Sequence, residues 1–237
     1  MHRWFLPLLC ALVALPALPA APQWGGSVTA SSNYLQRGVS RNYNDPALAA
    51  ELHVQLAGGA FAQLWSSSTR LREQDPTTLE LAGTAGFNGR IDAAWSWTAS
   101  LTHYEAPWSR YAASYRYDEL TLDLDWREHL LLSVSWSPDT SRYAPDYGFM
   151  LRRHATAWEA SYQQPLAAGM HAFGGVGYYD LSALFGSGYW YGSAGLGWSW
   201  RRWQADLSYV LPDGAARRLS YPGAARRRAL ATLSVDF

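Results

Sequence analysis

The sequence predicts an all-β protein, a transmembrane antiparallel up-and-down β-barrel of about 12 strands. Segments of alternating apolar and polar residues follow one another along the chain, and tight turns alternate with long connections between them. The last nine residues, 229–237, also alternate and end on the aromatic Phe237. Successive side chains of a strand point to opposite faces. In a membrane barrel one face meets lipid and the other meets the lumen.

The composition favours a membrane barrel over a soluble β-sandwich or a lipocalin-like barrel. The chain is 49% hydrophobic, 15% aromatic and 16% charged, with 13 Trp and 15 Tyr. Aromatic girdles at both membrane interfaces use many Trp and Tyr residues. A soluble barrel would alternate as well, but its outer face would be polar. The formal net charge is zero, which argues against nucleic acid as a partner.

The N-terminus has the pattern of a secretory signal peptide. His2 and Arg3 precede an apolar run over 5–15, followed by Pro16 and small residues. We expect residues 1–20 to be the signal and 21–237 to form the barrel in a bacterial outer membrane. Cys10, the only cysteine, lies in the apolar run. A disulfide framework and a cysteine-bound metal are therefore not expected in the exported chain.

Tight turns and long connections divide the exported chain into twelve expected strands. Paired glycines or Asn-Gly between alternating segments favour hairpin turns, because the central residues need a positive φ. The expected tight turns are Gly58-Gly59, Asn88-Gly89, 127–129, 166–169 and Arg201-Arg202. The long connections, expected outside the cell, are 37–47, 70–76, 105–112, 138–149, 181–188 and 211–227. The strands, of which 60–69 has the least regular faces, are then 26–36, 48–57, 60–69, 77–87, 90–104, 113–126, 130–137, 150–164, 170–180, 189–200, 203–210 and 228–237.

Alternation places eight of the 19 acidic residues on the inner face. Carboxylates that face lipid are costly, so this placement supports the assigned faces. A net negative lumen favours cations or sugars, whereas ion pairs among the same side chains could plug the barrel. The expected lumen residues are Glu51, His53, Glu80, Asp92, Glu119, Asp123, Asp125, Glu159, His171 and Asp206.

Arginines gather in the long connections. Guanidinium groups bind phosphates bidentately, and lipopolysaccharide in the outer leaflet is rich in phosphate. We therefore expect contacts with outer-membrane lipid and lipopolysaccharide through a collar of arginines. An anion-attracting vestibule is the alternative. The expected collar is Arg37, Arg41, Arg217, Arg218, Arg226, Arg227 and Arg228.

The histidines do not form a catalytic pattern. His154 and Thr156 share a strand face, but a hydrolase needs a nucleophile, a base and a group that orients the base. No serine lies beside His103 or His154 at such a spacing. Glu51 and His53 are two positions apart, but alternation along a strand produces this spacing by chance, so it does not indicate a metal site. We expect no catalytic residue, no cofactor and no metal site.

The segment Ser32-Asn33-Tyr34-Leu35-Gln36-Arg37-Gly38-Val39-Ser40, with Asp45-Pro46 after it, resembles the start of the TorF family of proteobacterial outer-membrane proteins. That family has a Ser-x-Tyr-x-x-Arg-Gly-x-Ser pattern at the end of its first strand; here Gln36 replaces the usual aromatic and Ala49-Ala50-Glu51 replaces a Gln-Gly-Gly-like stretch. The resemblance implies an outer-membrane barrel without an established activity.

The residues of this segment also have a physical reading. Gly38 permits a chain reversal, and we expect Arg37 where the first strand meets the outer leaflet. An anchor for the first long loop is the favoured interpretation, and ligand binding is the alternative.

A narrow channel or transport-related barrel for small solutes is the leading functional hypothesis. A structural or adhesive barrel that acts through its loops is the alternative, followed by a lipid-modifying enzyme. We expect the barrel-assembly machinery to recognise the terminal strand that ends in Phe237.

Overall fold

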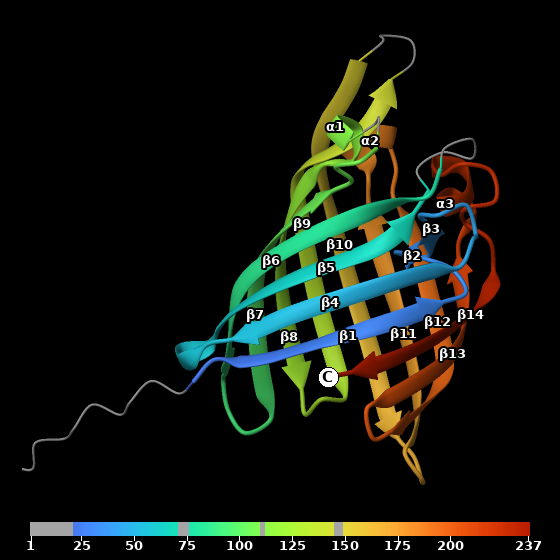
Figure 1. Ribbon diagram of the computed structural model, residues 1–237. Helices are drawn as coiled ribbons and strands as arrows, with labels where there is room; N and C mark the ends of the chain where they lie inside the picture. Colours follow the sequence, from blue (N-terminus) through green and yellow to red (C-terminus); the bar gives the residue numbers. More distant parts are fainter. Residues whose placement is uncertain (1–20, 71–75, 110–111, 145–148) are drawn as a thin grey trace, which may run out of the picture.

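The computed structural model describes residues 21–70, 76–109, 112–144 and 149–237, and these form a closed antiparallel barrel of twelve strands (Figure 1). The expected signal peptide lies outside the described residues. Each strand pairs with its neighbour in sequence, and β14 pairs with β1. The barrel strands are β1 Gln23–Ser31, β4 Ala47–Gln55, β5 Ala60–Thr69, β6 Thr78–Arg90, β7 Trp95–Glu105, β8 Tyr117–Trp126, β9 Leu130–Ala144, β10 Phe149–Pro165, β11 Met170–Asp180, β12 Tyr189–Trp200, β13 Trp203–Pro212 and β14 Arg228–Asp236.

Short elements lie in the connections. They are a two-stranded hairpin of β2 Leu35–Gln36 and β3 Val39–Ser40, the 3-10 turn η1 Ala57–Gly59, and the helices α1 Ala112–Tyr115, α2 Ser182–Phe185 and α3 Gly214–Leu219. In the described part of the chain, no helix is long and apolar enough to cross a bilayer.

The seam between the first and last strands is fully hydrogen bonded. Ser27 to Ser31 of β1 pair with Asp236 to Thr232 of β14. Beyond them, the Gly26 N–H donates to the Phe237 carbonyl at 3.1 Å, and the Phe237 N–H donates to the Gly26 carbonyl at 3.0 Å. A closed sheet has no unpaired edge, which is required of a strand structure in lipid.

The two faces of the wall have opposite character, as the alternation predicts. Large apolar side chains are exposed on the outside, with Leu48 and Leu207 each 60% exposed. Polar side chains are buried inside, among them Ser67, Glu80 and Ser135. A soluble protein buries the first kind and exposes the second. The distribution is therefore that of a wall facing lipid.

Four of the five expected tight turns are confirmed. Gly58, Gly59, Arg127, Ala168 and Arg201 all have the positive φ that such turns need. The strands that follow these four turns begin within one residue of their expected positions, including β5, whose faces are the least regular in the sequence.

The prediction of a turn at Asn88-Gly89 is wrong. Both residues continue β6, where they pair with Thr98 and Trp97, and the chain reverses over 91–94 instead. Asp92 causes this shift, because its carboxylate accepts from the N–H groups of Ala94 at 2.7 Å and Trp95 at 2.8 Å. These two bonds lower the pKa of Asp92 below its usual value. Asp92 is therefore an exposed turn residue and does not line the lumen.

Several other strand boundaries also differ from expectation, among them the start of β7 at Trp95 and the start of β8 at Tyr117, expected at 90 and 113. Most of the connection expected at 138–149 is strand, because β9 continues to Ala144 and β10 begins at Phe149, so this hairpin rises above its neighbours (Figure 1). The ladder shifts register between Arg153 and Ala155, opposite the stretch that contains Pro138. A bulge accommodates a proline, which cannot donate to the ladder. The first strand ends at Ser31 instead of residue 36.

Candidate functional site in the lumen

The first long loop, residues 32–46 (loop 1), folds back into the mouth of the barrel. Its hairpin β2–β3 turns at Arg37 and Gly38, whose φ angles are +49° and +77°. A Cβ placed on Gly38 would lie 2.8 Å from Cβ of Tyr191 on β12. Glycine therefore serves both the left-handed turn and the close approach of the tip to the wall. The expected chain reversal at Gly38 is confirmed.

Two ion pairs join loop 1 to the opposite wall. Nη2 of Arg37 lies 2.8 Å from Oε2 of Glu119 on β8, and each side chain is only 8% exposed. Nη2 of Arg41 lies 3.1 Å from Oε1 of Glu80 on β6, whose side chain is 2% exposed. Burial lowers the pKa of Arg37, but the Glu119 carboxylate and the nearby Tyr179 and Tyr117 together outweigh burial and hold that pKa well above its usual value.

Tyrosines of the wall complete these contacts. The Arg37 guanidinium lies 4.5 Å from the centre of the Tyr179 ring, a cation–π distance. The amide of Gln36 donates to the Tyr117 hydroxyl at 2.7 Å. Sequence reasoning does not single out these tyrosines, because they lie far along the chain from loop 1 and share their face with many similar residues.

Arg37 and Arg41 were expected in the lipopolysaccharide collar, and the structure corrects this placement. Both side chains point into the lumen and pair with Glu119 and Glu80. A buried carboxylate needs a cation close by, and a loop that folds inward supplies one. The interpretation of the motif as an anchor for loop 1 agrees with these contacts, although the anchor is inside the barrel and not at the lipid boundary.

The other polar residues of the motif hold the shape of loop 1. Ser40 is 1% exposed, and Asn33 and Asn42 are nearly as buried. Oγ of Ser40 lies 2.9 Å from Oδ1 of Asn33 and accepts from the Asn44 N–H at 3.0 Å. Oδ1 of Asn42 accepts from the Tyr34 N–H at 3.3 Å. These bonds satisfy backbone groups in a loop that has little regular structure.

The last long loop, residues 213–227 (loop 6), fastens loop 1 in place. The Tyr221 hydroxyl donates to the Ser40 carbonyl and accepts from the Tyr43 N–H, each at 3.0 Å. The rings of Tyr43 and Tyr221 stack with their centres 4.1 Å apart. The Ser40 N–H donates to the Ala224 carbonyl at 3.1 Å. Loop 1 is thus held from above by loop 6 and from the side by the barrel wall.

Among the remaining collar arginines, Arg228 also has a structural role. Its guanidinium donates to the carbonyls of Gly223 at 3.0 Å and Ala224 at 2.7 Å, and to Oδ1 of Asn44. It therefore connects loop 6 with loop 1. The other four collar residues are exposed at the long-loop end, and their contact with lipopolysaccharide stays a prediction: Arg217, Arg218, Arg226 and Arg227.

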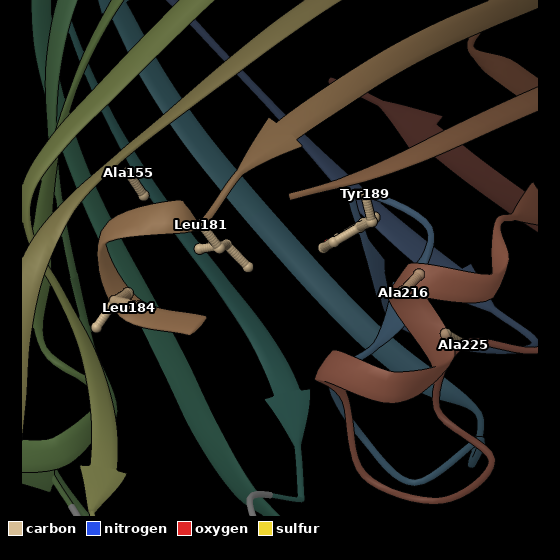
Figure 2. Close-up of a cluster of buried hydrophobic side chains, with 6 residues drawn as sticks. All are labelled: Ala155, Leu181, Leu184, Tyr189, Ala216 and Ala225. Carbon is tan, nitrogen blue, oxygen red and sulfur yellow. The ribbon is translucent and has the colours of Figure 1, made fainter. Parts of the chain in front are cut away.

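A cluster of buried apolar side chains lies at the long-loop end beside loop 1. Leu181 and Leu184 come from the α2 segment, Ala216 from α3, and Tyr189 from the start of β12 (Figure 2). Val39 of the loop 1 hairpin packs against this cluster. The long-loop end therefore has a small hydrophobic core of its own, built from the connections.

Two cavities lie beneath loop 1 and share several wall residues, including Leu131, Phe173 and Asp206. The upper cavity, of about 500 Å³, is bounded by the tip of loop 1, with Arg37 and Gly38 among its lining residues. The lower cavity, of about 380 Å³, reaches the short turn at 127–129. Together they extend from the loop 1 hairpin to the short-turn end of the barrel.

The expected lumen residues fall into three groups. Glu80 and Glu119 pair with loop 1. Asp125, Glu159, His171 and Asp206 line the two cavities, and Asp123 lies on β8 opposite Ser133 of β9. Glu51 and His53 line a separate hollow of about 250 Å³ near the short-turn end.

Local partners orient several of these side chains. Glu159 accepts from the Tyr191 hydroxyl at 2.6 Å. Nε2 of His171 lies 3.3 Å from Oδ1 of Asp206, and Nδ1 of His53 lies 3.1 Å from Oε1 of Glu51. In the part of the chain that the structure describes, no three His, Cys, Asp or Glu side chains gather in a group that could hold a metal ion.

A family model described as "Bacterial protein of unknown function (Gcw_chp)" matches residues 18–234. The chain belongs to this family. The description of the Gcw_chp family states no activity and does not contain the name TorF, so the TorF assignment stays a prediction. A comparison with curated proteins finds no match.

Solved porin structures share the fold of this Gcw_chp family member. The KdgM porin has 8% sequence identity and a TM-score of 0.54, over 90% of this chain and 98% of that one. The NanC porin has 10% identity and a TM-score of 0.56, over 89% and 97% of the two chains. A structure titled "KdgM porin in complex with disordered oligogalacturonate" has 6% identity and a TM-score of 0.56, over 91% and 99%. At such low identity the likeness shows the fold alone.

Proposed function

We propose that this Gcw_chp family member is an outer-membrane channel for small solutes, exported by a signal peptide over residues 1–20 and belonging to the TorF set of proteins. The observation that carries the proposal is the pair of cavities that extends from loop 1 to the short-turn end. The lipid-facing character of the outer wall and the porin-like fold support the location.

The lumen charges favour cations over anions. Arg37 and Arg41 are neutralised by Glu119 and Glu80. Asp125, Glu159 and Asp206 line the cavities below them, and no described arginine forms an ion pair with any of these three. Carboxylates of this kind raise the local concentration of cations in a low-dielectric passage.

Loop 1 limits the passage at the long-loop end. Solutes that enter from outside have to pass the hairpin, which the wall and loop 6 hold in place. We therefore expect a closed or weakly conducting resting state that opens when loop 1 leaves the lumen. The fold acts as a rigid frame, and the loop is the part that moves.

Planar-bilayer recording tests the proposal. The mature protein, with a folded barrel verified by heat-modifiable gel mobility, should give stepwise conductance, and a KCl gradient should give a reversal potential of the sign expected for cation selectivity. An Arg37→Ala variant, in which loop 1 loses an anchor, should conduct more than the wild type. If neither folded protein conducts, the channel is refuted.

Exposed arginines on the outer loops favour a second candidate, a structural or adhesive surface barrel. Arg217 and Arg218 of α3 and Arg226 and Arg227 after it are exposed at the long-loop end. These guanidinium groups suit phosphates of lipopolysaccharide. In a variant with these four arginines changed to Ser, we expect wild-type conductance and loss of lipopolysaccharide binding. This result would assign the loops a role separate from conduction.

We include neither a catalytic residue nor a cofactor in the proposal. The terminal strand that ends in Phe237 is proposed as the segment that the barrel-assembly machinery recognises.

A further inference from the structure

A carboxylate and a tyrosine occur together at three places around the lumen, and at two of them both contact the same arginine of loop 1. At the first, Glu119 and Tyr179 hold the guanidinium of Arg37, at 2.8 Å and 4.5 Å. At the second, Glu80 binds Arg41 at 3.1 Å, and the Tyr115 ring lies 5.9 Å from the same guanidinium. In both cases loop 1 supplies the cation.

The third place is Glu159 with Tyr191, and it lies in the wall of the upper cavity. The Tyr191 hydroxyl donates to Oε1 of Glu159 at 2.6 Å, which fixes the carboxylate beside the ring. No arginine of the described residues forms an ion pair with Glu159, and the sequence contains no lysine. Loop 1 comes close without filling this place, because Arg37 lines the same cavity but binds Glu119.

The surroundings of Glu159 suit a molecule with a cationic end and a short apolar or hydroxylated body. Phe173 and Val210 give the upper cavity an apolar surface, Ser161 and Ser193 add hydroxyls, and Asp206 offers a further carboxylate. The Glu159 carboxylate is partly buried and has no arginine partner among the described residues, so it favours a cationic ligand. The Tyr191 ring, joined to this carboxylate through its hydroxyl, supplies a face for a cation–π contact.

We propose that the upper cavity is a binding site for an organic cation, whose guanidinium or ammonium group pairs with Glu159 against Tyr191 as Arg37 pairs with Glu119 against Tyr179. The identity of this cation as the transported solute rests on the proposed channel function, whereas its binding does not. A ligand in the cavity contacts the tip of loop 1. Binding can therefore change the position of the hairpin that covers the mouth.

Isothermal titration calorimetry on the folded full-length mature protein in detergent tests the site. The probe is agmatine, which carries a guanidinium and an ammonium group on a four-carbon chain. 1,4-butanediol is the neutral control, and maltotriose tests for a neutral sugar. We expect saturable binding for agmatine and no binding for 1,4-butanediol or maltotriose. Glu159→Gln should weaken it by about tenfold or more, as expected for loss of a charge-assisted hydrogen bond.

Glu51→Gln is the matched control, because Glu51 is a lumen carboxylate in a different hollow. Binding should be unchanged in this variant. Tyr191→Phe keeps the ring and should weaken binding less than Glu159→Gln. If gel mobility shows that Glu159→Gln does not fold, Asp206→Asn replaces it as the test variant, because Asp206 lines the same cavity. We expect a smaller loss of agmatine affinity in Asp206→Asn.

The outcomes separate the site from the channel. Equal losses in Glu159→Gln and Glu51→Gln, tighter binding of maltotriose than of agmatine, or no binding of any probe by a folded and conducting protein would each overturn the cation site. Agmatine binding that depends on Glu159 in a protein without conductance would support the site and refute the channel.

Discussion

Arg37 and Glu119 lie 82 positions apart in the sequence and meet at 2.8 Å inside the barrel, where both side chains are nearly buried. This ion pair connects the tip of loop 1 with the wall across the lumen. It therefore holds the tip of loop 1 inside the lumen at the long-loop end. The Arg41–Glu80 pair also holds loop 1 inside the lumen, through a second strand, β6.

Arg37→Ala should open the channel. The change leaves Glu119 buried without its cation, and loss of one partner of a buried pair costs about 3–5 kcal/mol. The population with loop 1 in the lumen should therefore fall by roughly two to four orders of magnitude relative to the released state. Single-channel recording measures this as longer or larger openings. Arg217→Ala, an exposed arginine of α3, is the control and should match the wild type.

The charge-exchanged double variant Arg37→Glu with Glu119→Arg adds a second check. It should recover part of the closed behaviour if the pair itself holds the loop. Wild-type conductance in Arg37→Ala would contradict the role of the pair.

Gly38→Ala should displace the hairpin, and Gly58→Ala provides a matched comparison. The two glycines have nearly the same φ, +77° and +79°, so both substitutions cost about 1–2 kcal/mol of backbone strain. Only at Gly38 does the new Cβ meet a neighbour, Tyr191 at 2.8 Å, whereas nothing lies within 4 Å at Gly58. The rate of trypsin cleavage in loop 1 should rise in Gly38→Ala alone. Equal cleavage rates in the two variants would contradict the close packing of the tip.

Tyr221→Phe should loosen the contact between loop 6 and loop 1 without disturbing the barrel. The variant loses the hydrogen bonds to the Ser40 carbonyl and from the Tyr43 N–H but keeps the stacked ring. Each lost bond is worth about 1 kcal/mol. Hydrogen exchange of loop 1 amides should become faster, while strand amides stay protected. Tyr209→Phe, on the exposed outer wall, should leave the loop 1 exchange unchanged.

Asp206→Asn should lower the preference of the channel for cations. Asp206 lines both cavities, and one charge about 4 Å from a passing ion is worth about 1 kcal/mol in water. The cation-to-anion permeability ratio, from the reversal potential in a salt gradient, should fall by roughly fivefold. Asp92→Asn removes a charge from an exposed turn and should have little effect. A stable ratio in Asp206→Asn would place the selective region elsewhere.

Removal of Phe237 should weaken the barrel seam. The residue exchanges two backbone hydrogen bonds with Gly26, together worth about 2 kcal/mol. Phe237→Ala keeps both bonds and loses only the ring, so it separates the seam from recognition of the aromatic. We expect a lower unfolding free energy in urea for the shortened chain than for Phe237→Ala. Equal stability of the two would show that the ring, not the backbone pairing, matters.

The barrel can be predicted from the pattern of residues, because lipid on one side of the wall and water on the other leave a period of two in every strand. The inverted burial of Leu48 and Glu80 follows directly from that pattern. The turn at Gly58-Gly59 was equally visible, since a positive φ favours glycine. The sequence offers two nearby turn signals, Asn88-Gly89 and Asp92, and the first was chosen wrongly. The chain turns at Asp92, whose carboxylate accepts hydrogen bonds from two backbone N–H groups.

The position of loop 1 cannot be predicted in the same way, because it depends on contacts that form in the closed barrel. An arginine in a long connection gives the same sequence signal whether it faces lipopolysaccharide or folds inward, so Arg37 and Arg41 could not be placed from the pattern. Their positions depend on Glu119, Glu80 and Tyr221, which are distant in sequence and reach loop 1 only after the sheet has closed. Contacts of this kind carry no periodicity, because they join a loop to a wall instead of repeating along a strand.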